Sequence, residues 1–590
     1  MSYAEPQTSR APQHTAPTAE RRSRLSGPAR ARRRAERRAR DLSAVFLLVL
    51  SLVAASCGGS SSDNAGARRV GVNSLPPGAS GTGNANVGMG APVGVYAEEG
   101  APGVGARIEH DRANAEGYDR IVENPFLEVS RAPLSTFSID VDTASYSNTR
   151  RFINEGQLPP PDAVRVEELI NYFTYDYPQP AGDLPFSVNT EVADCPWNPR
   201  HRLVQIGLQG RRVSMEDLPP ANLVFLVDVS GSMEGPARLP LVKSSLRRLV
   251  DQLRPRDRVA VVTYAGSSGL ALPSTTGDRR GEIVAALGSL EAGGSTNGGQ
   301  GLRLAYRVAR ENFIRGGTNR VILATDGDFN VGVTGDDELV RLVEREREGG
   351  VSLSVLGFGM GNLKDSRMEK LADKGNGNYA YIDTQAEADR VFGEQIGGTL
   401  FTIARDVKIQ VEFNPRRVAG YRLVGYENRL LAAEDFNDDR KDAGEIGAGH
   451  TVTALYEVVP AGMKVENPGV DPLKYRQPAQ APPVGRGGEE LLTVKLRYKE
   501  PDSDQSRPLN VGVLDSAAAA ANASDGFKFA AAVAEFGLLL RGSRYKGSAT
   551  YDEVLRLARA STGADLGGHR AEFIGLVERA RSLAASGAGR

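Results

Sequence analysis

Short apolar runs alternate with amphipathic segments through the middle of the chain. The runs predict strands at residues 223–228, 257–264, 319–325, 351–358 and 378–383. The segments between them carry apolar residues at helical spacing, and they predict helices within residues 238–253, 299–312, 336–348 and 386–398. Strands that alternate with helices require crossover connections, which produce a mostly parallel sheet between helical layers. The sequence therefore predicts an α/β, Rossmann-like domain over residues 218–404.

The segments on either side of this domain have different patterns. Residues 116–217 combine alternating, strand-like stretches with two helical segments, which indicates an α+β N-terminal domain. Residues 405–515 contain stretches that alternate like antiparallel strands, with a Pro/Gly-rich loop near 463–487. Residues 516–590 carry apolar residues at helical spacing, and we expect these helices to pack on each other. The C-terminal part is thus predicted to be β-sandwich-like and then helical.

Residues 1–57 have the pattern of an export signal. Ten arginines fall within residues 21–40, and the apolar run 42–56 ends at Cys57. A run of about 15 residues is shorter than the roughly 20 that a membrane span needs. The segment resembles a bacterial lipoprotein signal peptide, which implies a lipid on Cys57, although Ala54 stands where that signal usually has Leu. An uncleaved signal anchor and an Arg-rich tail that binds nucleic acid are the alternatives.

Composition adds a tether and an expected location. Residues 58–115 are rich in Gly, Ser, Asn, Pro and Ala, which predicts a disordered tether. We therefore expect a protein of the bacterial cell envelope, lipid-anchored to a membrane and facing the periplasm or the exterior. The formal net charge of the 590 residues is -1, which does not indicate a nucleic-acid partner. If Cys57 carries lipid, Cys195 lacks a disulfide partner and is expected to be a buried, inert thiol; a Cys57–Cys195 bridge is the alternative.

Three loops supply side-chain oxygens where the predicted strands end. Asp228, Ser230 and Ser232 follow the first strand, Thr296 lies in a Gly-rich loop, and Asp326 follows the third strand. Ligands of such folds bind beyond the carboxyl ends of the strands. Carboxylates and hydroxyls suit Mg²⁺ or Mn²⁺, and the set also tolerates Ca²⁺. Two acids and three hydroxyls leave one coordination position open, which the carboxylate of another molecule can occupy.

These three motifs, in this order, resemble the metal-ion-dependent adhesion site of von Willebrand factor type A (VWA) domains. The resemblance implies that Ser230, Ser232 and Thr296 approach the ion most directly, with Asp228 and Asp326 often acting through water.

The segments that flank the A domain carry a second resemblance. They read STFSIDVDTASYSNTRRFINEGQLPPPDAVRVEELINYFTYDYP and ENRLLAAEDFNDDRKDAGEIGAGHTVTALYEVVP. Both resemble the bacterial YfbK-like family of VWA proteins, which is often lipoprotein-like. The family has an N-terminal family-specific domain, the A domain and a C-terminal domain of unassigned role. This resemblance implies an architecture and no defined reaction.

Other acidic residues are not assigned chemistry. Four acids of the N-terminal domain are expected to be solvated: Asp140, Asp142, Glu167 and Glu168. Further along, Asp435, Asn437 and Asp439 have the spacing of the first ligands of a calcium loop. Position six of that loop is Arg440 and position twelve is Ile446, so the pattern fails and predicts a polar turn.

Two classes of function follow from this sequence. The preferred one is a binding module in which the A domain captures an Asp or Glu of a protein partner through a divalent cation, without enzymatic activity and without a small-molecule substrate or nucleic acid. A metal-dependent hydrolase is the rival, and Asp328 is the spare acid that would serve it as a base. A metal-free structural scaffold is the third possibility.

Overall fold

The computed structural model describes residues 116–139, 142–295, 298–327, 336–361, 363–465, 489–501 and 503–587. The predicted signal peptide, Cys57 and the tether lie outside these residues, as do Thr296 and Asp328. Within the described part of the chain, no helix is long and apolar enough to cross a membrane.

The middle of the chain forms a six-stranded sheet in the order β10-β9-β8-β5-β6-β7. Its strands are β5 (Ala221–Asp228), β6 (Arg258–Tyr264), β7 (Ser268–Thr276), β8 (Thr318–Thr325), β9 (Ser352–Phe358) and β10 (Tyr379–Ile382). All neighbours are parallel except β7, which runs antiparallel to β6 at one edge. The five predicted strands are confirmed. The sequence reasoning missed β7 because this edge strand is largely exposed and has no continuous apolar run.

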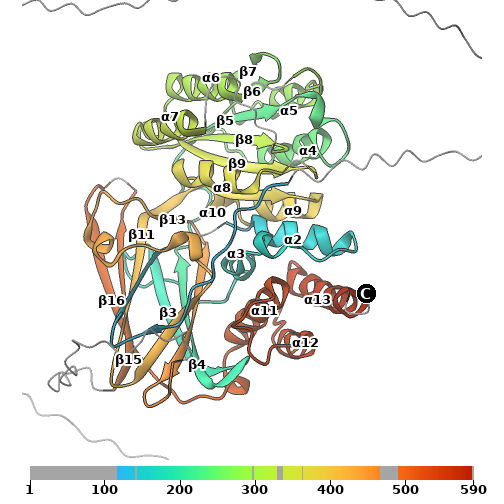
Figure 1. Ribbon diagram of the computed structural model, residues 1–590. Coiled ribbons are helices and arrows are strands. Elements are labelled where there is room, and N and C mark those ends of the chain that lie inside the picture. Colours follow the sequence, from blue (N-terminus) through green and yellow to red (C-terminus); the bar gives the residue numbers. More distant parts are fainter. Residues whose placement is uncertain are drawn as a thin grey trace, which may run out of the picture. The chain divides into compact units, whose positions relative to one another are not determined.

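Helices cover both faces of this sheet, as the alternation of strands and helices predicted (Figure 1). On β5, Leu223, Phe225 and Val227 pack in one apolar cluster with α4 (Leu239–Val250) and α5 (Arg280–Gly288). Val224 and Leu226 pack in a second cluster, whose helices are α6 (Gly298–Glu311), α7 (Asp336–Glu348) and α8 (Asp365–Lys374). Both faces of the strand are therefore buried, which explains why its apolar run is uninterrupted. The predicted helix at 386–398 is divided into α9 (Gln385–Asp389), the π-helical turn η3 (Arg390–Glu394) and α10 (Ile396–Leu400).

The flanking segments build a β-sandwich together. One sheet has the order β1-β12-β14-β4-β3, and the other has the order β13-β11-β15-β16 with β2 beside β11. The strands before the A domain are β1 (Leu127–Glu128), β2 (Leu134–Ser138), β3 (Phe186–Cys195) and β4 (Asn198–Gly210). Those after it are β11 (Thr402–Phe413), β12 (Val418–Val424), β13 (Gly444–Gly447), β14 (Thr451–Pro460), β15 (Glu490–Lys499) and β16 (Ser506–Leu514). Because β4 pairs with β14 and β2 pairs with β11, the A domain is an insertion between the two halves of this sandwich.

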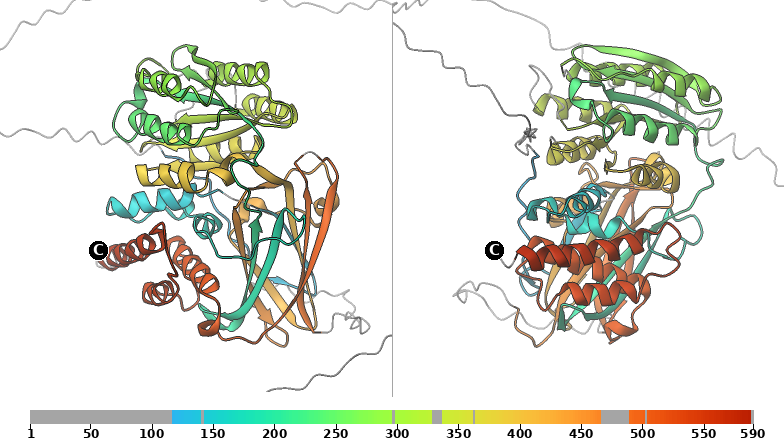
Figure 2. Two further views of the ribbon diagram at one scale, coloured as in Figure 1. Left: turned by 180° about the vertical axis from the view of Figure 1, so that it is seen from behind. Right: turned by 90° about the vertical axis from the view of Figure 1, so that its right-hand side faces the viewer.

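The remaining helices share one apolar core. They are α2 (Ala144–Asn154), α3 (Val166–Asn171), α11 (Asp525–Arg541), α12 (Tyr551–Arg559) and α13 (His569–Gly587). Figure 2 shows the C-terminal helices beside α2 and α3. The expectation that the acids of this segment are solvated is wrong for Asp142, Glu167 and Glu168, which are all buried. Asp140 lies outside the described residues. Two of the buried acids are held by backbone donors: Asp142 accepts from the amide of Tyr379 at 2.8 Å, and Glu168 accepts from that of Ser145 at 2.8 Å.

Candidate metal centre

The two candidate acids lie at the same edge of the central sheet. Asp228 is the last residue of β5, and Asp326 follows directly after β8. Because β5 and β8 are adjacent and parallel, their carboxyl ends meet at one edge. Both side chains are buried, with 0% and 1% of the residue exposed. After β5 the chain makes the short turn η2 (Gly231–Met233), on which Ser232 is half-buried.

Asp228 is held by donors from three segments. Its Oδ1 accepts from the amide of Ser230 at 2.9 Å, and its Oδ2 accepts from the hydroxyls of Tyr264 at 2.9 Å and Thr325 at 3.2 Å. The hydroxyls of Ser230 and Ser232 are 3.0 Å apart, so three of the predicted ligands form one connected group. Burial raises the pKa of Asp228; the hydrogen bonds from Ser230 and Tyr264 oppose this, and the nearby Asp326 adds to it.

The loop that contains Thr296 approaches this group at its described end. Gly293 donates its amide to the carbonyl of Val229 at 2.8 Å, and the carbonyl of Gly294 accepts from the amide of Gly231 at 3.0 Å. Gly294 has φ +85°, a conformation that suits glycine. The backbone at Gly293 and Gly294 is therefore bonded to the Asp-x-Ser-x-Ser loop.

The donors fit a hard divalent cation. Two buried carboxylates lie beside a pair of hydroxyls, and a cation would offset the desolvation of those carboxylates. Across the described ranges, no group of three or more His, Cys, Asp or Glu side chains is placed to hold a metal ion. The candidate set differs from such groups because hydroxyls make up much of it.

Three contributors were not predicted from the sequence. Tyr264 and Thr325 orient Asp228, and Arg238 places Nη1 3.8 Å from Oδ2 of Asp326. Thr325 had a signal, because it is the first residue of the Thr-Asp-Gly motif. Tyr264 ends a predicted strand that neighbours β5, whereas Arg238 has no local signal because its contacts depend on the tertiary fold.

A second oxygen-rich loop is occupied by lysine. The ammonium group of Lys408 donates to the carbonyls of Asp435, at 3.2 Å, and Asp438. Lys499 donates to the carbonyl of Asp439 at 2.6 Å. The loop between β12 and β13 therefore carries its own cations, which agrees with a polar turn.

The buried thiol is not placed for nucleophilic chemistry. Cys195 is buried and has no disulfide partner among the described residues, and burial raises its pKa well above the ordinary value, which disfavours the reactive thiolate. The neighbouring His201 directs Nδ1 at Oε1 of Glu457, at 2.6 Å. These contacts agree with the inert thiol that was expected.

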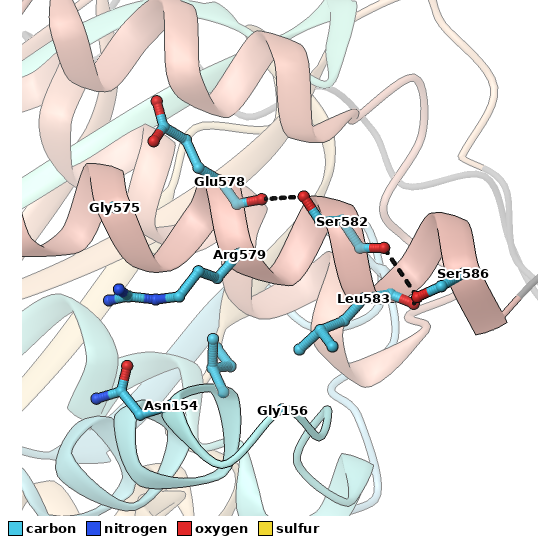
Figure 3. A pocket seen from close by; sticks show the side chains of 9 residues that line it. Asn154, Gly156, Gly575, Glu578, Arg579, Ser582, Leu583 and Ser586 are labelled. Carbon is cyan, nitrogen blue, oxygen red and sulfur yellow. Dashed lines mark hydrogen bonds between the residues drawn. The ribbon is translucent and has the colours of Figure 1, made fainter.

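Two cavities lie away from the candidate ligands. One of about 540 Å³ separates α2 from α13, where Asn154 and Gly156 face Arg579 and Leu583 (Figure 3). Another of about 410 Å³ is lined by η3, by residues near His450 and by Arg212. Neither is lined by the four candidate ligands that the structure describes, which are Asp228, Ser230, Ser232 and Asp326.

Comparison with known proteins assigns the chain to a family. The profile described as "von Willebrand factor type A domain" matches residues 222–394, that of "Uncharacterized protein YfbK, C-terminal" matches 398–583, and one described as "von Willebrand factor" matches 112–205. The "Uncharacterized protein YfbK" of Escherichia coli (strain K12) is 46% identical over 470 residues, which cover 78% of this chain and 80% of that protein. The chain belongs to the YfbK family.

More distant matches cover smaller parts of the chain. The human "Inter-alpha-trypsin inhibitor heavy chain H3" is 26% identical over 260 residues, or 40% of this chain and 28% of that protein. The solved structure "von Willebrand factor type A from Catenulispora acidiphila" has a TM-score of 0.37 and 17% identity, and the match covers 66% of this chain and 90% of that one. VWA domains typically mediate protein interactions, and they often bind a divalent cation at their adhesion site. This YfbK-family chain thus combines such a domain with the sandwich and helices of its own family.

Proposed function

We propose that this YfbK-family protein binds a protein partner through a divalent cation held at the carboxyl edge of its A domain. The ligands would be Asp228, Ser230, Ser232, Thr296 and Asp326, and the partner would supply the carboxylate of an Asp or Glu. The observation that carries this proposal is the group formed by Asp228 and the two serines, near Asp326, which directly follows the adjacent strand β8.

The contribution of the chain is to hold oxygen atoms in place before the cation arrives. Asp228 is fixed by Ser230, Tyr264 and Thr325, so little side-chain entropy remains to be lost on binding. Mg²⁺ prefers such hard ligands and near-octahedral geometry, and Mn²⁺ or Ca²⁺ would also be accepted. When bound, the cation supplies the positive charge that attracts the carboxylate of the partner.

We do not propose a catalytic role. A hydrolase would need a general base beside the cation. Among the described neighbours of the two acids, Tyr264 and Thr325 donate hydrogen bonds to Asp228 and Arg238 is a cation, so none of these three is placed as a base. Asp328, the sequence candidate for that role, lies outside the described residues.

We also propose that the protein is anchored in the cell envelope by a lipid on Cys57, with residues 58–115 as a tether. The Arg-rich segment, the apolar run and the cysteine support this proposal. Mass spectrometry of the membrane-extracted protein tests it, with an acylated N-terminal cysteine as the expected result. Recovery of Cys57 unmodified in the membrane fraction would favour the signal anchor.

Capture from envelope extract tests the binding function. The immobilised protein is exposed to extract in Mg²⁺ or in chelator, and the captured proteins are identified. We expect at least one partner that elutes with chelator and is lost with Asp228→Ala. The matched control is Asp251→Asn, which removes an exposed acid of the same domain and should leave capture intact. Capture that chelator does not affect would reject the adhesion function.

A further inference from the structure

Arg238 joins three loops at the candidate metal centre. Its guanidinium donates to the carbonyl oxygens of Ser232, after β5, and Met360, after β9, the latter at 2.8 Å. The same Nη1 that reaches Ser232 lies 3.8 Å from Oδ2 of Asp326, after β8. A single cationic side chain therefore contacts the loop that carries the serines and lies beside one of the two candidate acids.

The fold holds this side chain in one place. Gly359 has φ +74°, and a Cβ there would lie 2.6 Å from Nε of Arg238, so the position requires glycine. The backbone of Gly359 is fixed on both sides, by a hydrogen bond from its amide to Ala237 at 3.1 Å and by one from Tyr381 to its carbonyl at 2.6 Å. The Arg238 side chain is 15% exposed, so part of the guanidinium is accessible to a ligand from solvent.

We propose that Arg238 sets the charge of the metal centre and thereby makes it selective for an anionic ligand. This inference rests on the proposed function. Asp228 and Asp326 carry two formal negative charges, and Arg238 offsets one of them. With a divalent cation the group has one excess positive charge, which a single carboxylate neutralises. Without the guanidinium the loaded group would be neutral and would attract a carboxylate less strongly.

This role has two consequences of opposite sign. The guanidinium repels an incoming cation, so it should weaken metal binding in the absence of a ligand. It attracts an anion, so it should strengthen binding of a carboxylate to the loaded centre. If Arg238 had only a structural role, its removal would weaken both metal binding and carboxylate binding, because the loops that it joins would loosen.

Calorimetry with Mn²⁺, in the presence and absence of acetate as the carboxylate probe, separates these cases. For Arg238→Gln we expect about tenfold tighter Mn²⁺ binding without acetate. In the wild type, acetate should tighten Mn²⁺ binding, and by linkage Mn²⁺ tightens acetate binding equally. In Arg238→Gln this mutual enhancement should be lost. Arg238→Lys keeps the charge without the planar fork and should retain part of the enhancement.

The control is Arg307→Gln, which removes an exposed arginine of α6 in the same domain and should match the wild type. Circular dichroism of each variant establishes that it is folded. Equal Mn²⁺ affinity and equal acetate enhancement in the wild type and in Arg238→Gln would overturn this inference while leaving the metal site intact. Weaker Mn²⁺ binding in the variant would assign Arg238 a structural role. A wild type that binds no Mn²⁺ would instead reject the proposed function itself.

Discussion

Asp228 and Asp383 lie at the same edge of the same sheet, one at the carboxyl end of β5 and the other directly after β10. Asp228 accepts hydrogen bonds from a backbone amide and from hydroxyl groups. Asp383 accepts from Arg150, whose Nε lies 2.9 Å from Oδ2 and whose Nη2 contacts Oδ1. Both acids lie at the end of a parallel strand, with 0% of Asp228 and 6% of the Asp383 side chain exposed, yet of these two only Asp383 has a guanidinium bound directly to its carboxylate. The two acids thus share a position on the sheet and differ in their partners, and under the proposed function we infer that the partner decides whether an acid can bind a cation.

Ion pairs connect the β10 side of the A domain to α2 and to the start of α3. We call this contact, made by Arg150 and Arg165 with Asp383, Glu387 and Asp365, the ion-pair seam. Arg150 contacts Glu387 at 2.8 Å in addition to Asp383, and Arg165 contacts Asp365 at 2.5 Å. Burial of such charges is costly, and the cost is offset only when several hydrogen bonds satisfy each group. Burial acts to raise the pKa of Glu387, but the neighbouring Arg390 and Arg150 lower it to about 2. The seam is thus a structural contact in which every one of these acids already has its cation.

The largest expected effect is that of Arg150→Ala in this seam. Asp383 and Glu387 would remain buried without their shared guanidinium, and we expect a loss of about 3–5 kcal/mol in the free energy of unfolding. Because the folded pKa of Glu387 lies below its ordinary 4.5, the stability that it contributes is present above that pH and is lost as the pH falls toward 2. Urea unfolding at several pH values measures both effects. Arg247→Ala, which truncates an exposed arginine of α4, is the control, and equal midpoints for the two variants would contradict the seam.

Glu535 is the opposite case, a buried acid that receives no hydrogen bond from an arginine or a hydroxyl among the described residues. It lies in α11 with 0% exposed, and neither carboxyl oxygen has a hydrogen-bond partner within the part of the chain that the structure describes. Burial, with a smaller contribution from Glu553, raises its pKa from 4.5 to about 8. The folded state therefore holds a proton that the unfolded state releases, so stability decreases as the pH rises from 4.5 toward 8.

Glu535→Gln should remove this pH dependence. We expect about 3 kcal/mol of added stability at pH 7 and little change at pH 4. Thermal unfolding at the two pH values measures the difference. If Glu535→Gln were destabilised equally at pH 7 and pH 4, the Glu535 carboxyl group would have to make a stabilising interaction that does not depend on its proton.

The smallest expected effect is that of Tyr264→Phe at the candidate metal centre. The change removes one hydrogen bond to Asp228 and leaves the ring in place, so we expect a loss of about 1 kcal/mol in stability. Mg²⁺ affinity should fall by a few-fold, because Asp228 would be held less firmly. Unchanged stability and affinity would mean that Thr325 and Ser230 suffice to orient the carboxylate.

The sequence predicted the A domain more fully than its surroundings. Runs such as 223–228 and 351–358 identify strands because both of their faces are buried, and the loops that follow parallel strands must meet at one edge. Asp142, Glu167 and Glu168 were misjudged, because nothing local distinguishes an acid that receives buried amides or arginines from one in solvent. The sandwich was only partly predicted, since pairing of β4 with β14 joins residues more than 240 positions apart. Arg238 was missed because it contacts residues that are distant in the sequence, such as Met360.

Calorimetric titration of Mg²⁺ into the wild type, Asp228→Asn and Asp383→Asn tests most directly whether partners decide which acid binds a cation. Both substitutions neutralise a carboxylate at the end of a parallel strand of the same sheet. We expect one binding site in the wild type, no binding with Asp228→Asn, and wild-type affinity with Asp383→Asn. Loss of binding in Asp383→Asn with retention in Asp228→Asn, or absence of binding in the wild type, would contradict the account.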